Sequence, residues 1–255
     1  MTRGMKITAN DVGRHRVPDG ISNMKCQQDR FLRQAYADKA SSYYECSRSE
    51  MIPFIPVSTQ CLLDVGCGAG SFGAAVKSRI GCKVWGIEPE SDAVSRASSR
   101  LDQVVQGLFS DGANLPPKHF DCIVFNDVLE HILDPGRALV YARSLLKDGG
   151  GVVASIPNIG HFPTLWRLAV RGEWEYTDCG ILDKTHLRFF TRKSIRTLFE
   201  SSGYRLGRLE GINEYCQLVQ ADRCLWRYYK LLSLLPSPGI RDMRFLQFGL
   251  QAVAV

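Results

Sequence analysis

The stretch Leu62-Leu63-Asp64-Val65-Gly66-Cys67-Gly68-Ala69-Gly70 decides the fold of this chain. It opens as a short apolar strand, expected over 61–65, and turns through three glycines at alternate positions into a helix expected over about 71–80. Glycine lets a ligand approach the main chain closely, and the first turn of a helix attracts negative charge. This strand, turn and helix therefore predict a backbone cradle for a nucleotide-like ligand.

Outward from this unit, the chain continues as a regular alternation of apolar strands and helices. Strands that are separated by helices of this length form a parallel, doubly wound sheet, so the expected fold class is α/β. The further strands are expected over 83–87, 120–125, 151–156, 204–209 and 248–255, and the further helices over about 91–101, 135–146 and 194–202.

Two insertions interrupt the alternation. Residues 158–190 are rich in Trp, His, Gly and Thr and are expected to form a long irregular lid, because long loops in compact domains usually serve binding. A second insertion at about 213–243 contains an expected helical stretch over 217–235. Residues 1–25 show little apolar periodicity and are expected to be a flexible leader, followed by a helix within 29–50. Residues 26–255 are thus expected to form a single domain.

The composition is that of an ordinary globular protein, with 45% hydrophobic and 23% charged residues and a formal net charge of +6. The sequence contains no run of 18 apolar residues, so no membrane span is expected. No apolar segment of a secretion signal follows the first residues, so a cytoplasmic location is expected. The nine cysteines form no Cys-x-x-Cys pair. They predict neither a disulfide framework nor a zinc site, and no metal site is expected.

Two acids beside the Gly-rich turn favour S-adenosylmethionine (SAM) over a dinucleotide. Gly68–Gly73 spells the Gly-x-Gly-x-x-Gly pattern of a dinucleotide site, which alone is weak evidence. Asp64 ends the strand before the turn, where its charge would repel a pyrophosphate but suits a sulfonium and an ammonium group. Glu88, just before Pro89, ends the second strand, where a carboxylate can accept hydrogen bonds from both ribose hydroxyls.

These motifs together resemble class I SAM-dependent methyltransferases. Residues 62–70 look like the family's first motif and Gly86-Ile87-Glu88-Pro89 like its second. The segment 120–131 ends in Asn126-Asp127-Val128-Leu129-Glu130-His131 and is similar to the corresponding motif of the ubiquinone-type subgroup. The segment 156–191 is similar to a branch related to methionine-biosynthesis-associated and ubiquinone-type enzymes, whose members often modify small molecules. The resemblance implies a Rossmann-like seven-stranded sheet, mostly parallel, with helical and loop insertions as lids.

The resemblance also implies a set of cofactor contacts. The glycines of the turn would approach the methionine part of SAM, Glu88 would hold the ribose, and Asn126 would line the cofactor. One position departs from the subgroup, because Leu108 stands where an acid usually contacts the adenine amine. The expected cofactor-binding residues are Asp64, Gly66, Cys67, Gly68, Gly70, Glu88, Pro89 and Asn126.

Three histidines are candidates for the acceptor side of the site. A hydroxyl acceptor benefits from a nearby base, and histidine has a pKa near working pH. His186 lies in the expected lid, His131 follows the strand expected over 120–125, and His161 follows the strand expected over 151–156. Each of them can instead be a structural side chain. Three aromatic residues of the lid could wall an acceptor pocket or form the lid's own small core: Trp166, Trp174 and Tyr176.

The sequence thus predicts SAM-dependent methyl transfer to an oxygen or nitrogen of a small molecule, such as a sugar-containing precursor. The alternatives are an RNA methyltransferase, a non-catalytic SAM-binding regulator and a nicotinamide-dependent oxidoreductase. A basic cluster over 183–208 can be a solvated face or can attract an acidic partner, but nucleic acid is disfavoured because Asp127-Val128-Leu129 replaces the Pro-Pro motif of base amino-methylation. The stretch 217–235 suits a lid, a dimer contact or a peripheral membrane contact. The oligomeric state stays open.

Overall fold

The computed structural model describes residues 45, 47–214, 223–232 and 234–255, without the side chains of 223–226. All of these residues belong to one compact unit, Lys39–Val255. The leader expected over 1–25 and most of the helix expected within 29–50 lie outside the described residues. The end of that stretch is a 3-10 helix, η2 (Ser49–Phe54), which buries Met51 and Phe54.

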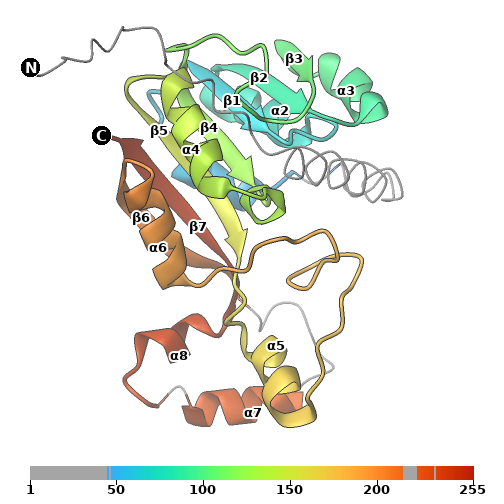
Figure 1. Cartoon of the computed structure of the whole chain (residues 1–255), viewed down its shortest axis with the longest axis vertical. Helices are drawn as coiled ribbons and strands as arrows, with labels where there is room; N and C mark the ends of the chain where they lie inside the picture. Colours follow the sequence, from blue (N-terminus) through green and yellow to red (C-terminus); the bar gives the residue numbers. More distant parts are fainter. Residues whose placement is uncertain (1–44, 46, 215–222, 233) are drawn as a thin grey trace, which may run out of the picture. The chain divides into compact units, whose positions relative to one another are not determined.

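A seven-stranded sheet forms the centre of this unit, with the strand order β3-β2-β1-β4-β5-β7-β6 (Figure 1). The first five strands of this order run parallel to one another, whereas β7 runs antiparallel to both β5 and β6. The expected doubly wound, mostly parallel seven-stranded α/β sheet is therefore confirmed. The strands are β1 (Cys61–Val65), β2 (Lys83–Glu88), β3 (Gln103–Gln106), β4 (Phe120–Asn126), β5 (Leu146–Pro157), β6 (Tyr204–Glu214) and β7 (Phe245–Ala254).

Two hydrophobic clusters hold the sheet between its helices. Because successive strand residues point to opposite faces, Leu63 of β1 joins the cluster that contains α4 and α6, whereas Leu62 joins the cluster of η2, α2 and α3. These helices match the expected ones within a few residues, although α3 ends earlier than the sequence predicted. The helices are α2 (Ser71–Ile80), α3 (Ser91–Ser98), α4 (Pro135–Leu145) and α6 (Arg192–Ser201).

The two insertions form a separate group of helices past the carboxyl end of β5 (Figure 1). The expectation of an irregular lid over 158–190 is partly wrong, because α5 (Phe162–Trp166) continues as a π-helix, η4 (Arg167–Arg171). The expected helix in the second insertion is α7 (Arg223–Leu232), and a short helix, α8 (Pro238–Asp242), was not expected. Among the described residues, no helix has the length and apolar character needed to cross a membrane.

Candidate functional site

The Gly-rich turn has the backbone conformation that only glycine adopts easily. Gly66, Gly68 and Gly70 have φ angles of 68°, 52° and 81°, in the left-handed region where a Cβ atom is strained. A Cβ on Gly66 would also lie 2.9 Å from Cγ2 of Val128, so the turn approaches the segment after β4 closely. The turn is therefore a cradle that a larger residue would fill.

Glu88 fixes this turn as well as facing the expected ribose position. Its carboxylate is 5% exposed, and Oε2 accepts a hydrogen bond of 3.0 Å from the Gly68 N–H. Oε1 accepts another, of 3.1 Å, from the Glu90 N–H. Burial raises the pKa of Glu88, and these two N–H groups oppose the shift. The side chain thus ties the turn to β2 before any ligand binds, which sequence patterns did not indicate.

Asp64 and Asn126 bring unsatisfied polar atoms to the carboxyl ends of neighbouring strands β1 and β4. Asp64 is 2% exposed, and among the described residues its Oδ2 has no hydrogen-bond partner. Burial, and then the nearby charge of Glu88, raise the pKa of Asp64 to about 8. Both polar side-chain atoms of Asn126 are likewise buried without a partner in the described part of the chain. Such orphaned groups imply a polar, cationic ligand, because buried polar atoms are costly when unpaired.

The remaining residues of the expected cofactor set have plainer environments. The sulfur of Cys67 packs against Gly86, and a Cβ atom added to this glycine would lie 2.5 Å from the sulfur. Burial raises the pKa of the Cys67 thiol. Pro89 connects Glu88 to the N-cap of α3. Leu108 is half-buried after β3, so an apolar side chain stands at the position where the resemblance led us to expect an acid.

The structure brings two of the three candidate histidines, His131 and His186, together. Their ring centroids are 4.7 Å apart, and His186 Nε2 lies 3.9 Å from Oε1 of Glu130. His131 and Glu130 belong to a 3-10 helix, η3 (Leu129–His131), which begins three residues after Asn126. The loop before α6 supplies His186, and the N–H groups of the next two residues donate to the Glu130 carbonyl. Sequence reasoning named the two histidines but missed Glu130.

His161 lies in a different place, as the N-cap residue of α5. Burial, and then the charge of Arg167, lower its pKa to about 4, so the ring is neutral at neutral pH. Trp166 stacks on Tyr228 of α7 at 5.2 Å. Trp174 instead packs edge-on against Phe189, close to His186, while Tyr176 is exposed. The expected aromatic wall is thus divided between the α5–α7 contact and the loop of His186.

A polar network around Asp127, just before η3, involves a residue that the sequence did not indicate. Arg48 ion-pairs with Asp127 and donates hydrogen bonds to Ser155 Oγ at 2.8 Å and to Gln247 Oε1 at 3.1 Å. Asp127 itself has a left-handed φ of 54°. The network clamps the ends of β4, β5 and β7, and so fixes the backbone between Asn126 and η3.

Most of the basic cluster over 183–208 is paired within the protein. Arg192 donates to both carboxylate oxygens of Asp242, at 2.8 and 2.7 Å, and Arg208 does the same to Glu210. Arg188 donates to the Leu133 carbonyl. These contacts favour the interpretation of the cluster as a solvated, self-paired face.

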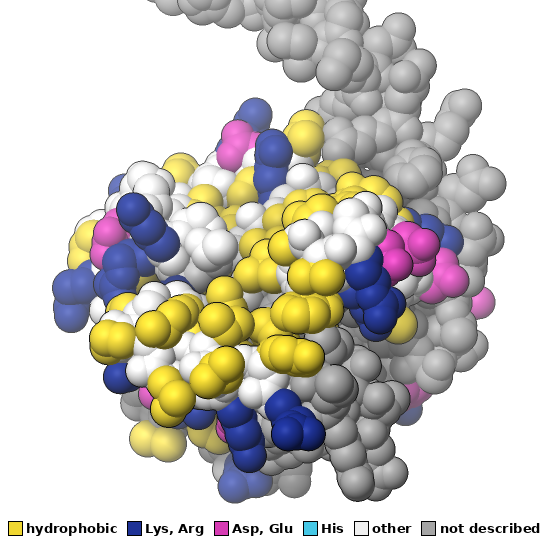
Figure 2. Space-filling model, turned by 90° about the horizontal axis from the view of Figure 1, so that it is seen from below, with side chains coloured by type: hydrophobic (Ala, Val, Ile, Leu, Met, Phe, Trp, Pro, Cys, Tyr) yellow, Lys and Arg dark blue, Asp and Glu magenta, His cyan; other side chains and the backbone are white. Residues whose placement is uncertain are grey.

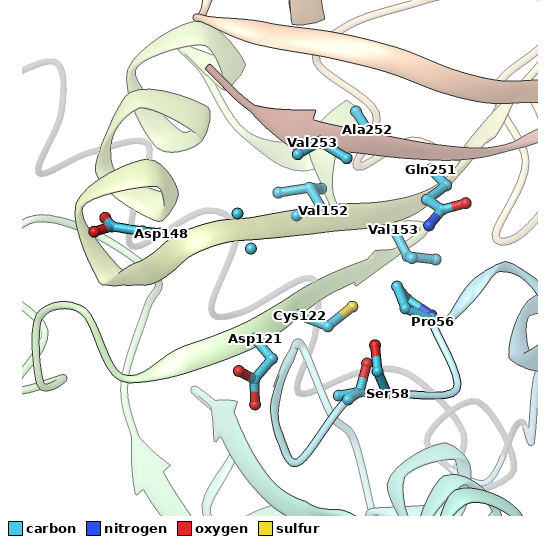
Figure 3. Close-up of a pocket in the computed structure, with 14 residues that line it drawn as sticks. Pro56, Ser58, Asp121, Cys122, Asp148, Val152, Val153, Gln251, Ala252 and Val253 are labelled. Atoms are coloured by element: carbon cyan, nitrogen blue, oxygen red, sulfur yellow. The ribbon is translucent and has the colours of Figure 1, made fainter.

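A shallow pocket elsewhere is unrelated to these groups (Figure 3). It is lined by the amino ends of β4 and β5, including Asp121 and Asp148, and by Pro56 and Ser58 before β1. The cradle and the histidines lie at the opposite, carboxyl edge of the sheet. In doubly wound sheets, ligands bind at that carboxyl edge.

Comparison with known proteins identifies the family. Residues 29–208 match the Methyltransf_23 family, described as a methyltransferase domain. An uncharacterized methyltransferase of Mycobacterium tuberculosis is 32% identical over 154 residues, which cover 54% of this chain and 75% of that relative. A ubiquinone biosynthesis O-methyltransferase of Xanthomonas campestris is 36% identical over 118 residues, which cover 44% of this chain and 48% of that relative.

Solved structures share the fold at low identity. A SAM-dependent methyltransferase from Archaeoglobus fulgidus superposes with a TM-score of 0.60 at 16% identity, covering 88% of this chain and 99% of that one. A chain from the complex of the Haloferax volcanii Trm112 methyltransferase activator with a putative methyltransferase gives 0.60 at 17% identity, covering 89% and 96%. This chain belongs to the methyltransferase-domain family. It is a class I SAM-dependent methyltransferase, and S-adenosylmethionine is its expected cofactor.

Proposed function

We propose that this enzyme transfers the methyl group of SAM to an oxygen or nitrogen of a small-molecule acceptor bound beside η3. The observation that carries the proposal is the sequence of groups after β4. Asn126, the last residue of β4, has two buried side-chain atoms without a partner in the described part of the chain, and four and five residues later Glu130 and His131 meet His186 in a buried cluster. A cofactor-facing group and titratable side chains thus follow one another along a single connection.

The cradle supports SAM binding in detail. The left-handed turn leaves room for the methionine part of SAM beside its backbone. Asp64 offers a buried carboxylate to a cationic group, and Glu88 has lone pairs left for ribose hydroxyls beyond its two backbone contacts. The proposed cofactor-binding set is the one expected from sequence: Asp64, Gly66, Cys67, Gly68, Gly70, Glu88, Pro89 and Asn126.

The transfer needs alignment and, for a hydroxyl acceptor, removal of a proton. The acceptor atom bonds to the methyl carbon as the carbon–sulfur bond breaks, and S-adenosylhomocysteine leaves. His186 Nδ1 donates to the Ile181 carbonyl at 2.9 Å, so the lone pair of the neutral ring is on Nε2, towards Glu130. We assign the acceptor-side role to His186 and His131, with His161 lining the lid at the start of α5.

The class of acceptor is the finer part of the proposal. One relative that matches over about half its length is named a ubiquinone biosynthesis O-methyltransferase, which favours oxygen as the acceptor atom. A sugar-containing or other biosynthetic precursor would supply such hydroxyl groups. RNA methylation gains no support, because Arg192 and Arg208 use their charges within the protein.

We further propose that the helical face of the insertions contacts an anionic lipid surface. Apolar side chains gather on this face with Lys and Arg at its edges (Figure 2). Val170, Leu231 and Leu234 are 59%, 69% and 79% exposed, and Arg227 and Lys230 of α7 are exposed as well. An apolar strip with basic flanks suits the boundary between acidic headgroups and acyl chains.

Vesicle sedimentation tests this surface. We expect the protein to pellet with vesicles that contain phosphatidylserine, and less with phosphatidylcholine alone. Replacing both Leu231 and Leu234 with Gln should abolish pelleting. Val57→Gln, at an apolar residue that is 91% exposed before β1, is the matched control and should pellet normally. Equal pelleting of the double variant and the wild type would remove the lipid surface from the proposal.

Incubation with methyl-labelled SAM and fractionated metabolites tests the catalytic proposal. We expect label in a small-molecule fraction with the wild type, and its loss with His186→Gln although SAM still binds. Label in RNA, or SAM binding without transfer to any fraction, would contradict the proposed function.

A further inference from the structure

Three metal-ligating side chains meet in the interior where η3 contacts the loop before α6. Glu130, His131 and His186 each offer one ligand atom, and these atoms all lie within 4.8 Å of one another. We propose that they bind one divalent transition-metal ion, with coordination positions left for an acceptor oxygen. This inference rests on the proposed function, because it names what the acceptor side of that site binds.

Glu130 is the first observation that points to a cation. The side chain is 1% exposed, and among the described residues neither carboxylate oxygen has a hydrogen-bond donor. An ionised carboxylate in such a place is costly unless a cation neutralises it. The charges of Asp127 and Asp183 add to the negative potential at Glu130. Of the charged groups with the largest effect on Glu130, only the Arg48 guanidinium is positive. A bound cation would satisfy both unpaired oxygens and this surplus of negative charge.

The two histidines are held in the orientation of metal ligands. His131 Nδ1 donates to the Thr185 carbonyl at 3.1 Å, and His186 Nδ1 donates to the Ile181 carbonyl at 2.9 Å. A carbonyl only accepts, so each Nδ1 keeps its proton and the lone pair of the neutral ring is on Nε2. Metal-binding histidines commonly donate their other N–H to a carbonyl in this way, which fixes both tautomer and ring direction.

The spacing requires only a small closure around an ion. Ligands that bind at about 2.1 Å with tetrahedral angles lie about 3.4 Å apart. His186 Nε2 and Glu130 Oε1 are 3.9 Å apart and all three ligand atoms lie within 4.8 Å of one another, so side-chain shifts of about 0.5–1.5 Å would bring them to ligand spacing. Two imidazoles and one carboxylate favour ions such as Mn²⁺, Fe²⁺, Co²⁺ or Zn²⁺ over Ca²⁺, which prefers oxygen ligands. Three protein ligands leave positions open, as in catalytic metal sites.

Titration of the full-length, chelator-treated protein with Co²⁺, followed by its visible absorption, tests the site. We expect one Co²⁺ per chain in the wild type. Glu130→Gln and His186→Gln should each weaken Co²⁺ binding at least about 100-fold. His119→Gln is the matched control, because this histidine packs on Trp85 at the amino end of β4 and should leave Co²⁺ affinity unchanged.

A second measurement needs no variant. Pulsed electron paramagnetic resonance of the Mn²⁺-loaded wild type should show nitrogen couplings from two imidazoles. Absence of stoichiometric Co²⁺ binding, or of these couplings, or full Co²⁺ affinity in a folded Glu130→Gln variant, would overturn the metal site. Methyl transfer with no bound metal would refute this inference alone, whereas metal and SAM binding without transfer would refute the proposed function.

Discussion

Replacing Asp64 with Asn should make the protein more stable and, at the same time, a poorer binder of SAM. Asp64 is buried with an unpartnered oxygen, and burial raises its pKa from 3.8 to about 8. Between these two values the folded protein holds a proton that the unfolded chain has lost. Stability therefore falls as pH rises through this window, because the native state binds more protons.

The magnitude follows from the width of the window. One proton taken up on folding changes the free energy of unfolding by about 1.4 kcal/mol per pH unit, so Asp64 removes roughly 2–3 kcal/mol of stability between pH 5 and pH 7. Asn has the same shape and does not titrate. Relative to the wild type, Asp64→Asn should gain roughly this amount over the same pH interval.

Urea unfolding without SAM at both pH values measures this gain, and calorimetry measures SAM affinity. The control is Asp121→Asn, because Asp121 accepts hydrogen bonds from two N–H groups and from Lys147, and its pKa is lowered. The stability that ionised Asp121 contributes is fully present above about pH 5 and is lost only as pH falls below about 4, so Asp121→Asn should be less stable than the wild type by the same amount at pH 5 and pH 7. If the Asp64→Asn and wild-type stabilities run parallel from pH 5 to 7, the carboxylate is not held ready for a cationic ligand.

Three other substitutions probe the turn, its acidic partner and the acceptor side. Gly66→Ala should cost more than Gly172→Ala in urea unfolding, by about 1–3 kcal/mol, because both have φ near 68° but only at Gly66 does a new Cβ meet a neighbour within 4 Å. Equal losses would show that the close approach after β4 is unimportant. Glu88→Ala should lower both the melting temperature and the SAM affinity, because the side chain holds the turn and faces the expected ribose position. Lower SAM affinity with an unchanged melting temperature would mean that Glu88 contacts the ligand but does not stabilise the turn. His186→Ala should slow turnover while calorimetry finds SAM affinity unchanged, and a loss of SAM binding would move this residue out of the acceptor side.

The sequence by itself determined the central unit of this protein. Cys61–Val65, the glycine turn and Ser71–Ile80 are local features, since a strand, a left-handed turn and a helix each depend on residues close along the chain. The two acids that favour SAM, Asp64 and Glu88, were also readable, because parallel strands place their carboxyl ends at one edge of the sheet. The helices inside the insertions were harder to predict, since α5 and α8 are only five residues each.

Only the tertiary structure decided how the cluster of Glu130, His131 and His186 is built. His131 and the Thr185 carbonyl are 54 residues apart, and Arg48 reaches Gln247 across 199 residues. No periodicity or spacing encodes such meetings, because they depend on where each loop returns to the sheet. In the sequence, Glu130 is only one residue of the motif over 120–131, and its burial beside two histidines follows from the packing of η3 against the His186 loop. The Gly-rich turn is thus set by local backbone preferences, whereas the cluster of Glu130, His131 and His186 is set by long-range packing.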